Sequence, residues 1–259
     1  MSTISRRTLL RSAAALLVTT STAALPLAAA SRTIPTCGCW LSARDAAALA
    51  LKPYGLIASD PQEVRIITST GDATIDKFLG SALLRLSNMF KVQPGFAFFD
   101  DGDSPSAYAT PETLLPQGTH TVMMGTHLFS EYMTRNDDAG MTIIAICAHE
   151  FGHIHQMEGG YRESLLKHDT TVRPIELHAD FLAGFFLASR KREYPNLELQ
   201  KVGETFYRLG DTAFKDRGHH GTPQERIAAI TAGYELGRNG NEDIDQVAQA
   251  GIDYVLRNL

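Results

Sequence analysis

The segment CAHEFGHIHQ, residues 147–156, constrains this chain most, because it sets histidines four positions apart within a run of helical apolar spacing. On a helix, His149 and His153 project from the same face, where two imidazoles can share one ion. Glu150 lies one step further round, so its carboxylate can take a proton from a water that the ion activates. The segment therefore predicts a helix that carries two ligands of a metal site.

This H-E-x-x-H pattern leaves an alternative open when it is considered alone. In a chain of 259 residues with nine histidines, it arises by chance in roughly one or two such chains in a hundred. A histidine pair that only packs in the core or lies on the surface would give the same letters. The metal hypothesis therefore needs a third ligand from elsewhere in the chain.

A zinc site requires that third protein ligand and an open fourth position for water. The segment ELHADFLAGFF, residues 176–186, places Glu176 and Asp180 on one helical face. Two carboxylates on an apolar helix are costly unless a positive group meets them. We expect Glu176 to ligate one zinc ion, the metal that suits two histidines and a glutamate best, and Asp180 to accept a hydrogen bond from a ligating imidazole. The alternative is a solvated face on which both carboxylates pair with arginines, the candidates being Arg173, Arg190 and Arg226.

Local patterns predict several elements around these motifs. Helical spacing or helix-end signals indicate helices over residues 42–51, 72–92 and 138–157, a helix from Pro174 to the basic cluster at 190–192, and a helix beginning at Thr222. At this last position Thr222, Pro223 and Glu225 form the sequence of a capping box. Short β-prone runs bounded by turn residues indicate strands at 95–101 (GFAFFDD) and 120–125 (HTVMMG).

Composition narrows the class of protein. The chain is 44% hydrophobic and 20% charged, which is typical of an ordinary globular protein. Its net charge is −5 and no basic run stands out, so nucleic acid is not expected as a partner. No linker, repeat or low-complexity tract divides residues 31–259, which we expect to form a single domain.

The first thirty residues have the pattern of an export signal. Arg6, Arg7 and Arg11 precede an apolar run that ends in three alanines at 28–30, which resembles a twin-arginine signal peptide. The run is interrupted by hydroxyl residues at 19–22 and by Pro26, which disfavours the alternative of a membrane-spanning anchor. We expect an exported, periplasmic protein without a stable membrane span after signal removal.

Cysteine usage adds little to this picture. Cys37 and Cys39 lie close together and Cys147 is far away, so one local disulfide or none is expected, with Cys147 buried in the core. A zinc site built from these three cysteines is disfavoured, because structural thiolate sites usually have four ligands.

HEFGH followed by ELHAD resembles the gluzincin metallopeptidases, in particular the HtpX/CAAX prenyl endopeptidase family and the small bacterial neutral zinc metallopeptidases with an ELQAD motif. The resemblance covers roughly residues 60–235. Downstream, residues 220–230 resemble a His-Pro-x-x-x-x-Arg-Ile segment, with Gly221 in place of the proline. Upstream, residues 104–112 (SPSAYATPE) resemble an Asn-Ala-Phe-Ala segment, with Ser106 in place of the asparagine.

The resemblance implies an α+β, mainly helical zincin-type metallopeptidase domain with a small sheet whose edge strand precedes the H-E-x-x-H helix. It implies that His220 donates to the oxyanion of the tetrahedral intermediate; the step of six residues to Arg226 favours His220 over His219. Arg226 either braces Asp180 or only anchors its helix. An extended peptide would add to the edge strand formed by Thr121, Val122, Met123, Met124 and Gly125.

These features together predict an exported zinc endopeptidase that acts on peptides or unfolded proteins, with Glu150 as general base. The remaining histidines, such as His155 and His178, are expected to be structural or at the surface. One alternative is an exported zinc-binding or chaperone-like protein with an inactive peptidase site, which would not need Glu150. Another is a different zinc hydrolase, such as a cell-wall amidase, which would not need an edge strand that pairs with an extended peptide.

Overall fold

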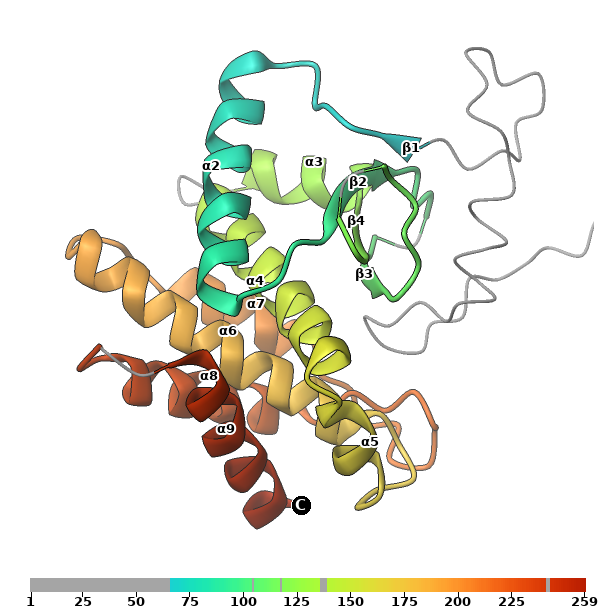
Figure 1. Cartoon of the computed structure of the whole chain (residues 1–259), viewed down its shortest axis with the longest axis vertical. Helices are drawn as coiled ribbons and strands as arrows, with labels where there is room; N and C mark the ends of the chain where they lie inside the picture. The colour runs from blue at the N-terminus through green and yellow to red at the C-terminus, as the bar shows by residue number, and fades with distance from the viewer. Residues whose placement is uncertain (1–65, 104, 117, 136–138, 241–242) are drawn as a thin grey trace, which may run out of the picture. The chain divides into compact units, whose positions relative to one another are not determined.

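Helices form most of the computed structural model, and a small sheet lies beside them (Figure 1). The structure describes residues 66–259 except 104, 117, 136–138 and 241–242. The helices are α2 (Ala73–Phe90), α3 (Thr126–Arg135), α4 (Ala139–Glu158), α5 (Tyr161–Leu166), α6 (Arg173–Glu193), α7 (Gln200–Leu209), α8 (Pro223–Gly237) and α9 (Ile244–Asn258). The strands are β1 (Ile66–Ile67), β2 (Gly95–Phe99), β3 (Ala107–Thr110) and β4 (Thr121–Gly125). The expected α+β, mainly helical class is confirmed.

Three expectations lie outside the described residues. They are the export signal at residues 1–30, the helix at 42–51 and the cysteine pair Cys37 and Cys39. Cys147, in contrast, is described and is buried in the core as expected, with a free thiol. No helix among the described residues is both long enough and apolar enough to cross a bilayer.

Local signals predicted α2, α4, α6 and α8 and the strands β2 and β4. The carboxylate of Asp72 caps α2 by accepting from the backbone N–H groups of Thr74 and Ile75. Thr222 and Glu225 form the expected capping box at the start of α8. The strands β1 and β3 and the helices α3, α5, α7 and α9 were not predicted, although α7 and α9 each have a well-defined apolar face.

The order of strands in the sheet is β1, β2, β4, β3. β4 pairs in parallel with β2 on one side and antiparallel with β3 on the other. The prediction that the strand preceding the H-E-x-x-H helix lies at the edge of the sheet is therefore wrong. The five residues of β4 are buried, and the backbone of the strand is paired on both sides, so Thr121, Val122, Met123, Met124 and Gly125 cannot add an extended peptide.

The segment that follows β4 directly is the helix α3. The buried carboxylate of Asp101 accepts from the backbone N–H groups of His127 and Leu128 at 2.8 and 3.1 Å. These two bonds satisfy donors that a helix N-terminus leaves open. The end of β4 is therefore tied directly to the start of α3.

α4 lies between the sheet with its neighbouring helices α2 and α3 and the helices that follow α4 in the chain. It packs against α2, α3 and β3 on one side and against α6 on the other. α6 packs in turn along α8, and α9 lies against both (Figure 1). On α6 every residue from Pro174 to Ser189 is buried, so any polar group on this helix must find its partners inside the protein.

Two glycines bring α6 and α8 into close contact. A Cβ atom at Gly184 would collide with the carbonyl oxygen of Ile230, and one at Gly233 would collide with the carbonyl oxygen of Phe181. Only glycine fits at such an approach of two backbones. The close contact sets the distance between α8, which carries Arg226, and α6, which carries Asp180.

Candidate metal centre

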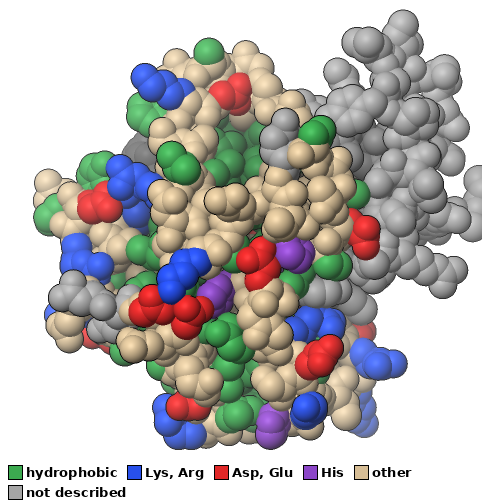
Figure 2. Space-filling view, viewed as in Figure 1, with side chains coloured by type: hydrophobic (Ala, Val, Ile, Leu, Met, Phe, Trp, Pro, Cys, Tyr) green, Lys and Arg blue, Asp and Glu red, His purple; other side chains and the backbone are tan. Residues whose placement is uncertain are grey.

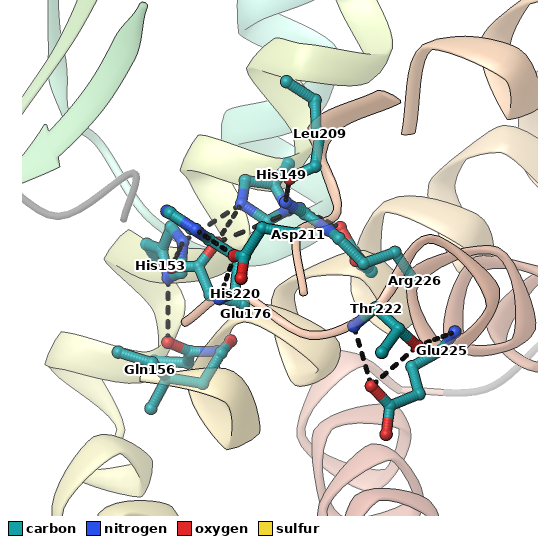
Figure 3. A network of polar contacts seen from close by, with 12 residues as sticks. His149, His153, Gln156, Glu176, Leu209, Asp211, His220, Thr222, Glu225 and Arg226 are labelled. Carbon is teal, nitrogen blue, oxygen red and sulfur yellow. Dashed lines mark hydrogen bonds and ion pairs between the residues drawn. The ribbon is translucent and has the colours of Figure 1, made fainter. Parts of the chain in front are cut away.

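Helices α4 and α6 bring His149, His153 and Glu176 together at one point (Figure 3). The Nε2 atoms of the two histidines are 3.1 Å apart, and each lies 3.4 Å from a carboxylate oxygen of Glu176. Gly152 faces Ala179 across the two helices, where a Cβ atom would lie only 3.3 Å from the Ala179 Cα. The absence of a side chain at Gly152 therefore allows the helices to approach closely enough for their polar groups to meet.

The two Nε2 atoms and the carboxylate of Glu176 lie close enough together to share one ion. Bonds of about 2.0–2.1 Å in a tetrahedral zinc site place ligand atoms roughly 3.3–3.4 Å apart. The two Nε2 atoms are 3.1 Å apart, and each lies 3.4 Å from a different oxygen of Glu176, Oε2 for His149 and Oε1 for His153. Glu176 is 0% exposed, and neither of its carboxylate oxygens has a hydrogen-bond partner among the described residues. The guanidinium of Arg226 lies 3.9 Å from Oε2 of Glu176 but is hydrogen-bonded to Asp180, so the donor set still fits a divalent ion.

The environment keeps Glu176 in the form that binds a cation. Burial acts to raise the pKa of its carboxyl group, but the facing imidazoles of His153 and His149 outweigh burial and hold the pKa well below its usual range. These imidazoles therefore favour the ionised form of the carboxylate. An ionised carboxylate and two neutral imidazoles are the forms in which these residues ligate zinc.

The second ring nitrogen of His149 faces Asp180, at 2.8 Å between Nδ1 and Oδ1. Asp180 also accepts from Nε and Nη2 of Arg226 at 2.7 and 2.8 Å. Burial raises the pKa of Asp180, but the guanidinium of Arg226 lowers it by more. The alternative in which Glu176, Asp180 and Arg226 lie on a solvated face is wrong, because all three are at most 1% exposed.

The second ring nitrogen of His153 contacts an amide instead of a carboxylate. Its Nδ1 is 3.0 Å from Oε1 of Gln156, whose Nε2 contacts the carbonyl oxygen of Ile175 at 2.8 Å and Nδ1 of His178 at 3.0 Å. Nε2 of His178 is 2.9 Å from the carbonyl oxygen of Ala248 on α9. Sequence analysis missed Gln156, for which the only signal is its position three residues after His153.

The expected base, Glu150, lies next to His149 on α4 and is 0% exposed. His220 lies beside Glu176 and His153 (Figure 3). Its Nδ1 and its backbone N–H contact Oδ2 of Asp211 at 3.0 and 2.9 Å. Asp211, which sequence analysis also missed, therefore holds the ring of His220 next to the candidate ligands.

Asp211 binds the neighbouring histidine as well. Nδ1 of His219 is 2.5 Å from Oδ1 of Asp211, and the same oxygen accepts from the backbone N–H of Ala213 at 2.7 Å. Burial raises the pKa of Asp211, but the hydrogen bonds from His220, His219 and Ala213 lower it well below its usual range. One carboxylate thus organises the segment that connects α7 to α8.

The donor atoms are covered by surrounding structure. His149 is 2% exposed, and His153 is 0% exposed. The ring of Phe206 on α7 packs against the imidazole of His149, with centroids 5.9 Å apart, and lies under the guanidinium of Arg226. Phe206 on α7 therefore contributes to covering His149.

A second group of potential ligands, Asp100, Asp101 and His127, lies near the start of α3. The carboxylate of Asp101 accepts hydrogen bonds from the backbone N–H groups of Ser106, His127 and Leu128. Asp100 and His127 are exposed. This group is accounted for as a helix cap, whereas the oxygens of Glu176 on α6 have no hydrogen bonds among the described residues.

On the face shown in Figure 2, basic and acidic side chains of the described residues are interspersed.

Comparison with family models, with curated proteins and with solved structures gave no match. The function must therefore be argued from the geometry of the site.

Proposed function

We propose that this chain is a zinc-dependent peptidase of the gluzincin type, with His149, His153 and Glu176 as ligands and Glu150 as general base. The observation that carries the proposal is the convergence of two buried imidazole Nε2 atoms on the two oxygens of a buried carboxylate that has no hydrogen bonds among the described residues. A mainly helical domain with a small sheet before the H-E-x-x-H helix supports a zincin-type fold.

The residues around the site have the chemistry that peptide hydrolysis needs. A bound zinc ion would act as a Lewis acid on the scissile carbonyl and lower the pKa of a water toward neutrality. The Glu150 carboxylate would accept the proton of the attacking water and deliver it to the leaving amine nitrogen. Nδ1 of His220 donates to Asp211, so Nε2 of the same ring would donate to the developing oxyanion in the doubly protonated, imidazolium form of the side chain.

The substrate we propose is an extended peptide or unfolded protein segment. Because β4 is central, the strand available on this side of the sheet is β3, which is outermost among the described strands and packs against α4. β3 lies within the segment that resembles the Asn-Ala-Phe-Ala motif. A peptide that paired with β3 would be bound through its main chain, with little selection among side chains.

Export to the periplasm remains part of the proposal and depends on the pattern of residues 1–30 alone. Burial of the site supports one alternative function. Because Glu150 and the ligands are covered, a zinc-binding protein with a closed, inactive peptidase site would have the same arrangement. A zinc hydrolase with another substrate, such as a cell-wall amidase, would use the same ligands and base.

The test is cleavage of casein by the zinc-loaded chain beside the Glu150→Gln variant at equal zinc occupancy. We expect the variant to lose cleavage by at least about 100-fold while retaining zinc, because it keeps the shape of the base but cannot accept a proton. Equal cleavage by both proteins would contradict the assignment of Glu150. Zinc binding without cleavage by either protein would favour the closed zinc-binding protein.

A further inference from the structure

We infer that Gln156 and His178 are positioning residues that hold His153 in the tautomer able to ligate a metal ion, and that they link this ligand to the C-terminal helix α9. The role of these two residues in metal binding rests on the proposed function. The hydrogen-bond chain itself does not depend on a metal, since every member of the chain belongs to the protein. Each member, from His153 through Gln156 to His178, is 0% exposed.

The protons of this chain are assigned by the two backbone carbonyls at its ends. The carbonyl oxygen of Ile175 can only accept, so the group of Gln156 at 2.8 Å from it is the amide NH₂. The carbonyl oxygen of Ala248 can also only accept, so Nε2 of His178, at 2.9 Å, carries a proton. Nδ1 of the neutral His178 ring is then an acceptor, in agreement with its distance of 3.0 Å from the Gln156 amide nitrogen.

The same logic determines the proton on His153. Since the NH₂ group of Gln156 faces Ile175 and His178, its carbonyl oxygen faces His153 and can only accept. Nδ1 of His153 must therefore be the donor, and in the neutral imidazole Nε2 then keeps its lone pair. That lone pair is on the atom that lies 3.4 Å from Glu176 and 3.1 Å from Nε2 of His149.

Packing keeps the chain of hydrogen bonds in place. Gly251 on α9 lies against the His178 ring, and a Cβ atom there would lie 2.9 Å from Cδ2 and 3.1 Å from Nε2 of the ring. A larger residue would displace the ring from Ala248. The two ligating histidines are thus oriented differently, His149 by the carboxylate of Asp180 and His153 by a neutral amide whose orientation depends on α9.

A purely structural role for these residues would satisfy buried polar groups without selecting a tautomer. The two roles differ in a property that can be measured without metal and without substrate. Long-range proton–nitrogen correlation spectra of the metal-free full chain, with ¹⁵N-labelled histidine, report which ring nitrogen carries the proton. We expect His153 to be protonated at Nδ1 and His178 at Nε2, which are opposite tautomers.

The variant Gln156→Leu tests whether Gln156 selects the tautomer of His153, because leucine has a similar size but no hydrogen-bond acceptor. We expect His153 to lose its preference for the Nδ1–H tautomer and zinc affinity to fall about 10–100-fold, the usual effect of removing such a partner. Ile143→Val, a buried change elsewhere on α4, controls for general loss of stability and should leave both properties unchanged.

Two results would overturn the inference. One is a wild-type His153 protonated at Nε2 in the metal-free chain, which needs no variant and so does not depend on folding of Gln156→Leu. The other is a folded Gln156→Leu protein with an unchanged tautomer and unchanged zinc affinity. If the tautomers are as expected but the wild-type chain neither binds zinc nor cleaves casein, the proposed function fails while the tautomer assignment stands.

Discussion

The guanidinium of Arg226 binds the carboxylate of Asp180 through two hydrogen bonds, of 2.7 and 2.8 Å, in the interior of the protein. The bidentate geometry is the strong form of a charge-assisted pair. Because Asp180 also faces Nδ1 of His149, the pair connects α8 to a proposed metal ligand on α4. The same contact therefore contributes both to stability and to the site.

Replacement of Asp180 by asparagine should weaken both properties. The buried charge of Arg226 would lose its bidentate carboxylate, so we expect the free energy of unfolding to fall by about 3–5 kcal/mol. Zinc affinity should fall about 10–100-fold, because His149 loses the group that orients it. Urea unfolding of the metal-free protein and zinc titration measure the two effects. Asp253→Asn, an exposed change on α9, should alter stability by no more than about 0.5 kcal/mol.

Alanine at Gly233 should separate α6 from α8. The added Cβ would collide with the carbonyl oxygen of Phe181, so the helices must shift, at an expected loss of about 1–3 kcal/mol in the free energy of unfolding. The matched control is Gly80→Ala on the exposed face of α2, where a Cβ meets no atom within 4 Å. There we expect a gain of about 0.5–1 kcal/mol from helix propensity. Thermal unfolding of both variants tests the prediction, and a stable Gly233→Ala protein would contradict it.

Zinc should stabilise the folded chain, because the ligands come together only in the native state. At a free zinc concentration about 100 times the dissociation constant, the expected gain is about 2.7 kcal/mol. A chelator should remove the gain and lower the melting temperature. The double variant His149→Ala, His153→Ala should show neither response, whereas His168→Ala, in the turn after α5, should respond like the wild type. A wild-type melting temperature that is independent of zinc would argue against the metal centre.

Acid should remove the contribution of Asp211 to stability. The folded-state pKa of this carboxyl group lies below its ordinary value of 3.8, so its stabilisation is present above that value and is lost as the pH falls through the lower folded-state value. The difference in unfolding free energy between the wild type and Asp211→Asn should therefore be larger at pH 7 than at pH 2. Chemical denaturation at the two pH values tests this. A difference that grows in acid would mean that Asp211 is not held as the ionised partner of the two histidines.

Much of the helical structure and half of the site can be inferred from local patterns. The positions of α2, α4, α6 and α8 follow from apolar period and capping residues, which act within a few positions of the chain. The pairing of His149 with His153, and of Glu176 with Asp180, follows from the pitch of a helix, which places residues four apart on one face. These relationships are local, so they need no knowledge of the fold.

The remaining features depend on contacts between distant parts of the chain. The central position of β4 results from its pairing with both β2 and β3. The sequence pattern of a strand does not show whether the strand is central or at an edge. Arg226 is buried instead of solvated because two glycines bring α8 against α6. The chain from His153 to Ala248 needs α4, α6 and α9 packed together, since a hydrogen bond forms only where packing brings donor and acceptor to about 3 Å.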